Sequence, residues 1–289
     1  MRFARLGPAG DEIPVAIDDD GEVLDLRSLT GDISGGFLAS DPGPDALVRH
    51  ARAAGDLPVV DRADGLRRGS PVARPGKVVC IGLNYRDHAA ETGADIPTEP
   101  IVFMKDPMTV IGPDDEVLVP RGSTKTDWEI ELAIVIGTTA RYCASEDEAA
   151  THIAGYAIAN DVSERAFQLE RGGQWDKGKS CETFNPLGPW LVTPSALEAD
   201  GLDPNALSLQ LRVNGELRQD GSTRDMIFRP AEIVRYLSQF MVLYPGDVIS
   251  TGTPAGVALG SGAPYLQAGD VVELTAEGLG SQRQTMGAA

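Results

Sequence analysis

Cysteine, histidine and basic residues are scarce in this 289-residue sequence, and the shortages of cysteine and of basic residues exclude whole classes of function. The three cysteines, Cys80, Cys143 and Cys181, are widely spaced and form no Cys-x-x-Cys pair, which argues against a disulfide framework and a thiolate zinc site. A reducing cytoplasm is therefore the expected compartment. The 25 basic residues face 43 acidic ones, and the net charge of −18 argues against nucleic acid and against an anionic membrane surface as partners.

Short strand signals separated by turns dominate the sequence, and no stretch reaches the roughly 18 consecutive apolar residues of a membrane span. We expect a small N-terminal α+β domain over residues 1–70 and a larger domain over residues 75–289, with a linker in the Pro- and Gly-containing stretch 67–76. Because most strands follow one another without regular intervening helices, we predict a β-rich α+β fold rather than a doubly wound Rossmann fold. The expected strands are 2–6, 13–17, 22–26, 78–81, 101–104, 128–136, 155–159, 207–213, 216–218, 248–251 and 271–276, and the expected helices are 46–54, 146–153 and 230–241.

Two glutamates alternate with apolar residues at the start of the longest strand candidate. Glu129 and Glu131 share one face of that strand, because alternate residues of a strand point the same way. Neighbouring carboxylates repel each other and are costly to bury, and a divalent cation would relieve both problems. Asp161, at the end of strand 155–159, could be a third ligand, and such oxygen ligands favour Mg²⁺, Mn²⁺ or Ca²⁺ over zinc. The alternative is a solvated strand face, with Asp161 as a helix N-cap.

A histidine and a glutamate follow the strand at 78–81 with the spacing of neighbours on a helix. If this segment is helical, His88 and Glu91 are three residues apart and can touch. A glutamate that orients a histidine through its ring N–H makes a competent general base. The alternative is an ordinary structural or surface histidine.

Two lysines and one cysteine lie in the turn-rich stretch 174–189. Lys177 or Lys179 could pair with a substrate carboxylate or stabilise an enolate, although a solvated cationic loop is the usual meaning of lysines here. Cys181 is interpreted as a packing residue, because no His–Cys arrangement can be read from the sequence. The segment 250–257, which contains Thr253, follows a strand and could hold an oxyanion with its N–H groups and hydroxyls.

Taken together, these segments resemble the fumarylacetoacetate hydrolase family. The matching blocks run in the family's order from about Lys77 to the C-terminus. Each block alone is common, but their combination is highly specific. The blocks are 82–85 with His88 and Glu91, 103–105, 129–132, 160–161, 179–180, 186–189 and 250–257.

The resemblance implies a mixed β-roll fold, usually in a homodimer, and it assigns roles to individual residues. Mg²⁺ or Mn²⁺ would be held by Glu129, Glu131 and Asp161, while His88 and Glu91 would activate water. Lys179 would stabilise an enolate. Substrate contacts would come from Tyr85, Arg165, Gln168 and Thr253. Leu83 departs from the arginine that many members have between the glycine and the asparagine of the first block.

Two runs, 121–128 and 167–179, resemble a branch that acts on 2,4-diketo-3-deoxy-L-rhamnonate and -L-fuconate, whose members are also labelled as ureidoglycolate lyases. The resemblance therefore implies hydrolysis of a 2,4-diketo-3-deoxy sugar acid, a 2-keto acid, to pyruvate and a hydroxy acid such as lactate. Alternatives are a lyase or decarboxylase acting on oxaloacetate or ureidoglycolate, and an isomerase or hydratase of aromatic breakdown. A non-enzymatic keto-acid binder is less favoured, because a binder needs no water-activating histidine.

Overall fold

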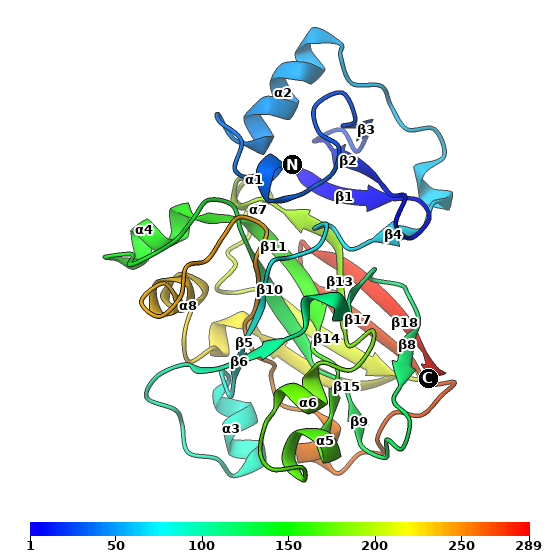
Figure 1. Cartoon of the computed structure of the whole chain (residues 1–289), viewed down its shortest axis with the longest axis vertical. Coiled ribbons are helices and arrows are strands. Elements are labelled where there is room, and N and C mark those ends of the chain that lie inside the picture. The colour runs from blue at the N-terminus through cyan, green and yellow to red at the C-terminus, as the bar shows by residue number, and fades with distance from the viewer.

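Two β-sheets and a small two-stranded ribbon form the framework of the computed structural model, which describes residues 1–289 (Figure 1). The large sheet has eleven strands, and a second sheet has five. Helices are short and lie around this framework, and none has the length and apolar character that a membrane-crossing helix needs. The predicted β-rich mixed fold is therefore confirmed.

The large sheet combines strands from both ends of the chain, so the N-terminal segment continues the sheet of the larger part. Its central path, in spatial order, is β3 (Val23–Asp25), β2 (Ile13–Ile17), β1 (Arg2–Leu6), β13 (Asn185–Val192), β11 (Ile153–Asn160), β10 (Ile130–Ile136), β16 (Val248–Ser250), β5 (Val78–Gly82) and β6 (Ile101–Lys105). Off this path, β4 (Arg68–Gly69) pairs with β1 and β7 (Val110–Ile111) pairs with β13. Two residues of the expected linker thus belong to the sheet as β4.

The smaller sheets complete the strand framework. The five-stranded sheet runs β15 (Glu216–Ser222), β14 (Ser208–Val213), β17 (Val271–Ala276), β18 (Gly280–Ala288) and β8 (Val117–Val119). The ribbon pairs β9 (Thr126–Asp127) with β12 (Ser163–Glu164). The helices are α1 (Gly35–Leu38), α2 (Pro44–Ala54), α3 (Arg86–Thr92), α4 (Glu146–Thr151), α5 (Arg165–Leu169), α6 (Asp176–Lys179), α7 (Pro194–Ala199), α8 (Pro230–Leu237) and α9 (Ala258–Ser261), with 3₁₀ turns at Ala63–Gly65, Pro107–Thr109 and Thr223–Asp225.

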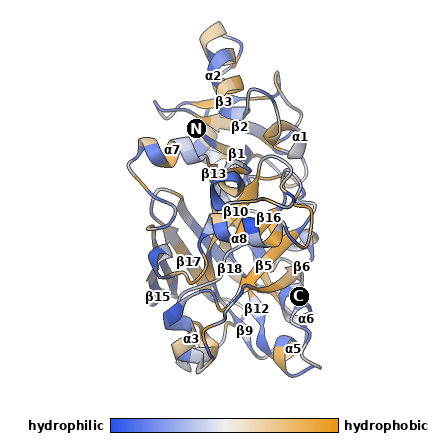
Figure 2. Ribbon diagram, turned by 90° about the vertical axis from the view of Figure 1, so that its left-hand side faces the viewer, coloured by the Kyte–Doolittle hydropathy of each residue, from blue (hydrophilic) through white to orange (hydrophobic).

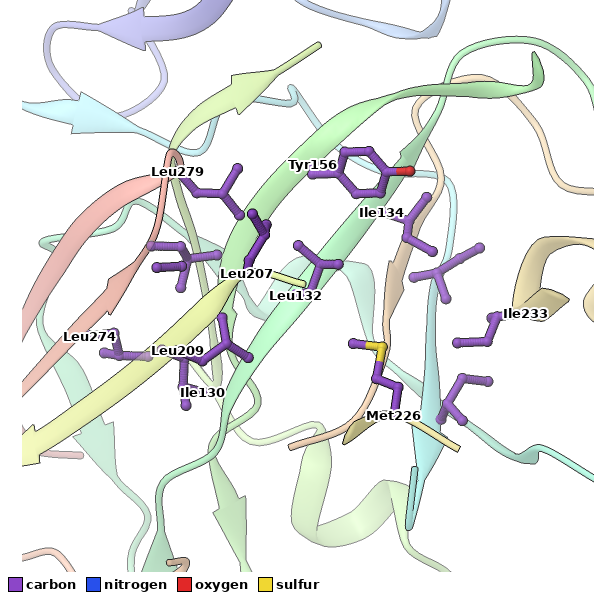
Figure 3. Packing of buried hydrophobic residues seen from close by; sticks show 14 of the residues in the cluster. Ile130, Leu132, Ile134, Tyr156, Leu207, Leu209, Met226, Ile233, Leu274 and Leu279 are labelled. Atoms are coloured by element: carbon purple, nitrogen blue, oxygen red, sulfur yellow. The ribbon is translucent and has the colours of Figure 1, made fainter. Parts of the chain in front are cut away.

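Strand β10 lies at the centre of the molecule, and both of its faces are buried. Ile130, Leu132 and Ile134 point to the five-stranded sheet, where they meet Leu207 and Leu209 (Figure 3). The opposite face carries alanine and valine side chains, which belong to a second apolar cluster shared with α1 and the N-terminal strands. Figure 2 shows the hydrophobic residues gathered along the central strands, such as β5. The predicted alternation along this strand is therefore confirmed.

Most expected elements are present, and the errors fall at element ends and in polar or Gly/Pro-containing strands. Strand β10 begins at Ile130 instead of Trp128, and helix α8 ends at Leu237 instead of continuing to residue 241. Strand β13 contains Gly and two Pro residues, and β18 carries polar residues at most positions, so neither shows the apolar pattern of a strand. Ser145 caps α4 as expected, because its hydroxyl accepts a hydrogen bond from the N–H of Glu148.

The interface between the two sheets should dominate the stability of the protein. Leu132→Ala removes a fully buried side chain and is expected to lower the free energy of unfolding by about 2–5 kcal/mol. Leu217→Ala is the matched control, because that leucine on β15 is 44% exposed, and its effect should stay within about 0.5 kcal/mol. Urea unfolding of both variants measures the difference, and equal losses would contradict this account of the core.

Candidate active site

Three buried carboxylates meet at one end of β10 and β11. The antiparallel register places Ile130 opposite Asn160, so the residues just before β10 and just after β11 are neighbours. The N–H of Asp161 donates to the carbonyl of Glu129 at 2.9 Å, which fixes this proximity. Oxygen atoms of Glu129, Glu131 and Asp161 lie within 4.8 Å of one another, and all three residues are at least nine-tenths buried. The structure thus brings together the three residues that the sequence suggested as metal ligands.

Buried cations pair with two of these carboxylates. The Lys179 ammonium lies 2.7 Å from Glu129 Oε2 and 2.7 Å from Asp161 Oδ2. The Arg165 guanidinium donates to Glu129 Oε1 at 2.6 Å. Burial alone would raise the pKa of the Glu129 carboxyl, but attraction to Lys179 and Arg165 outweighs it and lowers the pKa to about 2. The same pairing raises the pKa of Lys179, against the effect of burial, so both groups stay charged.

Lys105 is a third buried cation, and the sequence alone suggested no role for it. Its ammonium pairs with Asp161 Oδ1 and donates to the carbonyls of Val162 and Phe184 at 3.1 and 2.7 Å. The available signal was a lysine at the end of the apolar strand 101–104, where a charged residue needs a partner if it is buried.

Glu131 differs from the other two carboxylates because no cation pairs with it. Its Oε2 accepts one hydrogen bond, from the N–H of Gly252 at 2.8 Å. Burial and repulsion from Asp161 and Glu129 together raise the pKa of the Glu131 carboxyl well above its ordinary value. The ionised form of Glu131 therefore lacks a positively charged partner.

The donor chemistry of this cluster fits a divalent cation. With Asp127, which contacts Arg165 at 2.8 Å, the cluster contains four carboxylates. When all four are ionised, the three positive charges of Lys105, Arg165 and Lys179 leave one negative charge in excess. A divalent ion would reverse this excess and supply the missing partner of Glu131, and oxygen-only ligands suit Mg²⁺ or Mn²⁺.

Asp127 connects the cluster to helix α9, and sequence reasoning missed it. Its two oxygens accept hydrogen bonds from the N–H groups of Ala258 and Leu259 at 2.8 and 3.0 Å. Its second oxygen also holds the Arg165 Nε. Asp127 therefore acts as a positioning residue, since it fixes both the guanidinium and the start of α9. From the sequence, Asp127 stood out only as a residue that precedes an apolar strand.

His88 and Glu91 form a pair on α3, as their spacing predicted. His88 Nδ1 lies 3.3 Å from Glu91 Oε2. The N–H of Gly256 donates to both oxygens of Glu91, at 3.0 and 3.2 Å. A Cβ atom at Gly260 would lie 2.5 Å from the Glu91 carboxyl carbon, so α9 packs closely against this side chain. These contacts hold the Glu91 side chain in place, and Glu91 in turn orients the His88 ring.

A cavity of about 190 Å³ joins the carboxylate cluster to His88. Of the residues predicted for the site, all but Glu91 and Tyr85 line this cavity. Those that line it are His88, Glu129, Glu131, Asp161, Arg165, Gln168, Lys179 and Thr253. Glu91 lies behind His88. Tyr85 is fully buried in the main apolar cluster and does not reach the cavity, so the structure does not support the predicted substrate contact.

The two predicted substrate contacts beside the cluster differ in what they can offer. Gln168 Oε1 accepts from Arg165 at 3.0 Å, which leaves the amide NH₂ free to donate. The Thr253 hydroxyl donates to the carbonyl of Ile130 at 2.7 Å and accepts from Gln219 at 2.8 Å. Thr253 would have to change its hydrogen-bond partner to donate to a substrate.

The structure separates the two lysines of the 174–189 stretch. Lys179 is buried in the cluster, whereas Lys177 is exposed and donates to the carbonyl of Arg171 at 2.7 Å. Cys181 is half-buried, and burial raises the pKa of its thiol to about 11. A thiol that stays protonated at neutral pH is a poor nucleophile, which agrees with a packing role.

Apolar side chains form the outer wall of the cavity. These side chains are Leu83, Phe103, Leu169, Trp175 and Leu259, and Leu169 and Leu259 remain 45% and 40% exposed. Leu83 has a φ of 52°, a left-handed conformation that costs a leucine roughly 1–2 kcal/mol. Arg165 and Lys179 are the only cationic side chains in the lining, and both are paired with carboxylates.

A larger cavity of about 830 Å³ lies beside the N-terminal strands and Trp190, but it lacks comparable chemistry. Its arginines are paired with acidic residues: Arg2 with Asp200, and Arg68 with Asp114. No histidine, cysteine or lysine lines it. The smaller cavity is therefore the candidate active site.

Comparison with known proteins points in the same direction. The family model described as the fumarylacetoacetate (FAA) hydrolase C-terminal domain matches residues 77–286. A 2,4-didehydro-3-deoxy-L-rhamnonate hydrolase of Sphingomonas sp. (strain SKA58) is 48% identical over 286 residues, which cover 98% of this chain and 95% of that protein.

Two solved structures resemble the whole chain. Fumarylacetoacetate hydrolase from Exiguobacterium antarcticum has a TM-score of 0.83 and 33% identity, with 100% of both chains covered. Maleylpyruvate hydrolase from Sphingobium sp. SYK-6, solved with manganese(II) and pyruvate, has a TM-score of 0.80 and 27% identity over the same coverage. The family match, the nearly full-length relative and the shared fold together show that this chain belongs to the fumarylacetoacetate hydrolase family of enzymes.

Proposed function

We propose that this enzyme hydrolyses a carbon–carbon bond of a 2,4-diketo-3-deoxy sugar acid, giving pyruvate and a hydroxy acid such as lactate. The observation that carries this proposal is the presence, in one small cavity, of the carboxylate cluster and of a histidine held by Glu91. The relative that is 48% identical over nearly the full length carries the name of a hydrolase for such a substrate. Within the proposal, Glu129, Glu131 and Asp161 hold Mg²⁺ or Mn²⁺.

The chain's own residues account for the activation of water. Glu91 holds Nδ1 of His88, which leaves Nε2 to take a proton from a water molecule in the cavity. The hydroxide attacks the C4 carbonyl, the C3–C4 bond breaks, and its electron pair forms the enolate of pyruvate. C3 then takes up a proton, while C4 leaves as the hydroxy acid. Lys179 stabilises the negative charge that develops on the enolate. A bound divalent ion would polarise the 2-keto acid end of the substrate.

The outer wall of the cavity favours a substrate with one carboxylate. A second carboxylate at the far end would meet Leu83, Leu169 and Leu259, and it would find no unpaired cation there. An uncompensated charge in such surroundings is unfavourable. A deoxy sugar acid that ends in a methyl group suits this wall, whereas a longer 2-keto acid with a second carboxylate at its far end does not. The wall therefore supports the sugar acid over the dicarboxylic substrates of aromatic breakdown.

Three further expectations belong to the same proposal. The family resemblance implies a homodimer, and the low cysteine content favours the cytoplasm. The division into an N-terminal part over residues 1–70 and a catalytic part over residues 75–289 also stays a prediction, because the large sheet runs through both.

Pyruvate release is the direct test of the proposal. Purified protein with Mg²⁺ or Mn²⁺ should release pyruvate and lactate from 2,4-diketo-3-deoxy-L-rhamnonate, and EDTA should abolish the reaction. Oxaloacetate should react far more slowly in a parallel assay. Turnover of oxaloacetate alone would replace the hydrolase by a decarboxylase, and metal-independent turnover would remove the ion from the mechanism.

His88→Ala should lower kcat by about 10²–10⁴, because the variant lacks the group that takes the proton from water. His50→Ala is the matched control, because His50 is exposed on α2 and does not line the active-site cavity. This variant should keep normal activity. Steady-state kinetics give the ratio, and the rise in melting temperature with Mn²⁺ should be the same in both variants. Near-normal turnover of His88→Ala would assign the base to another group.

Substitutions of two neighbouring glutamates should change stability in opposite directions when EDTA is present. Glu129→Gln breaks a buried ion pair with Lys179 and Arg165 and should destabilise the protein by about 3–5 kcal/mol. Glu131→Gln removes a carboxyl with no cation partner and should stabilise the metal-free protein. Both variants should lose the stabilisation by Mn²⁺.

The gain from Glu131→Gln should also depend on pH. Because the pKa of Glu131 is raised in the folded state, the folded protein holds this proton more tightly than the unfolded chain. The wild type therefore loses stability as pH rises above the unfolded pKa, while the variant does not, so the gain should grow between about pH 5 and pH 8. Urea unfolding at several pH values measures it. A loss equal to that of Glu129→Gln would show that Glu131 has a partner.

A further inference from the structure

A second cluster of metal-ligating side chains lies away from the active site. The sulfur of Cys143, a carboxylate oxygen of Glu148 and a ring nitrogen of His152 all lie within 4.8 Å of one another. The three residues lie just before, within and at the end of α4. This helix lies beside α8, on a flank of the molecule remote from α3, α5 and α6 (Figure 1). Glu131 and Gly137, which bonds to His152, are six residue steps apart along β10, a span of about 20 Å. The two clusters are therefore independent.

Local structure fixes the backbone of all three residues. Glu148 and His152 are four residues apart on α4 and its C-cap, so they share one face of the helix. The N–H of Cys143 donates to Ser238 Oγ at 3.0 Å, and its carbonyl accepts from Gln239 Nε2 at 3.1 Å. The carbonyl of His152 accepts from the N–H of Gly137 at 2.7 Å. Binding an ion would thus require side-chain movement only.

Existing contacts use only part of the ligand capacity of these side chains. Glu148 Oε2 accepts from the N–H of Ala144 at 2.7 Å as part of the helix cap, which leaves Oε1 available. His152 Nδ1 lies 2.8 Å from Thr138 Oγ1, which leaves Nε2 available. A hydrogen bond on the second ring nitrogen is the usual arrangement of a histidine that binds metal, because it fixes the ring and the tautomer.

We propose that Cys143, Glu148 and His152 form a second metal site, which binds Zn²⁺. Sulfur and imidazole nitrogen are ligands that zinc prefers, in contrast to the oxygen-only cluster of the active site. Cys143 binds as the thiolate and releases its proton, so thiolate and carboxylate balance the charge of the ion. Cys143 is buried, whereas Glu148 is exposed and His152 is half-buried, so water reaches the fourth position from the solvent side.

The site would link Cys143, in the segment before α4, to the middle and the end of that helix. A bound ion would stabilise the folded chain, because the three ligands are not assembled in the unfolded one. The sequence did not indicate it, because the spacing Cys-x₄-Glu-x₃-His matches none of the zinc signatures with paired cysteines.

Cobalt(II) distinguishes this site from the catalytic one, because a thiolate ligand gives an intense near-ultraviolet charge-transfer absorption that oxygen ligands cannot give. Full-length protein is freed of metal and titrated with Co²⁺ in the presence of excess Mg²⁺. We expect one such thiolate–cobalt chromophore per chain, and its displacement by Zn²⁺. Cys143→Ser should abolish it, and Cys181→Ser should retain it as the matched control.

His152→Gln is the second variant, because it alters a half-buried side chain and keeps the buried thiol in place. It should weaken Co²⁺ binding by more than the roughly 10–100-fold that loss of an outer-shell partner costs. Zn²⁺ should raise the melting temperature of Glu129→Gln, which lacks the catalytic ion site, but not that of the double variant Glu129→Gln/His152→Gln. Absence of the chromophore in the folded wild type, or its persistence in Cys143→Ser, would overturn the proposal, as would Zn²⁺ binding confined to the catalytic carboxylates.

Discussion

The active site depends on the need to balance three carboxylates that the sheet buries side by side. The register of β10 and β11 forces Glu129 and Asp161 together, and Glu131 follows on the same strand. Lys179 and Arg165 come from the helices after β11, so the segment that supplies a carboxylate also leads directly to its counterions. These cations leave Glu131 without a partner. Two of the three carboxylates are thus compensated by side chains of the protein, and the third is left for a metal ion.

Contacts through α9 determine where His88 lies. Asp127 holds the start of α9, and the loop before α9 holds Glu91 through the N–H of Gly256. Helix α3 is thus attached to the strand that carries the glutamates, although His88 and Glu129 are far apart in the sequence. This attachment holds His88 in the lining of the active-site cavity. A shift of α9 would move the histidine and the guanidinium of Arg165 together, because both depend on contacts with this segment.

Much of this site could be predicted from the sequence, since its strongest signals are local. The alternation that places Glu129 and Glu131 on one face, and the spacing of His88 and Glu91, follow directly from strand and helix periodicity. Lys105 and Asp127 were missed because their partners lie in segments distant in sequence, and no local pattern distinguishes a buried lysine from an exposed one. The position of Tyr85 likewise depends on distant segments, because its ring packs in the main apolar cluster. Strand β18 was missed because its pairing with β17 and β8, rather than its own apolar content, makes it a strand.

The two candidate ion sites differ in ligand chemistry, and this difference would let them favour different ions. The active-site cluster offers only carboxylate oxygens, which suit Mg²⁺ or Mn²⁺. The cluster at α4 offers sulfur and imidazole, and it lies about 20 Å or more along the strand direction from the carboxylates. Which ion the carboxylates would hold depends on the free concentrations of magnesium, manganese and zinc, whereas the ligand types of Cys143 and His152 would favour zinc at α4.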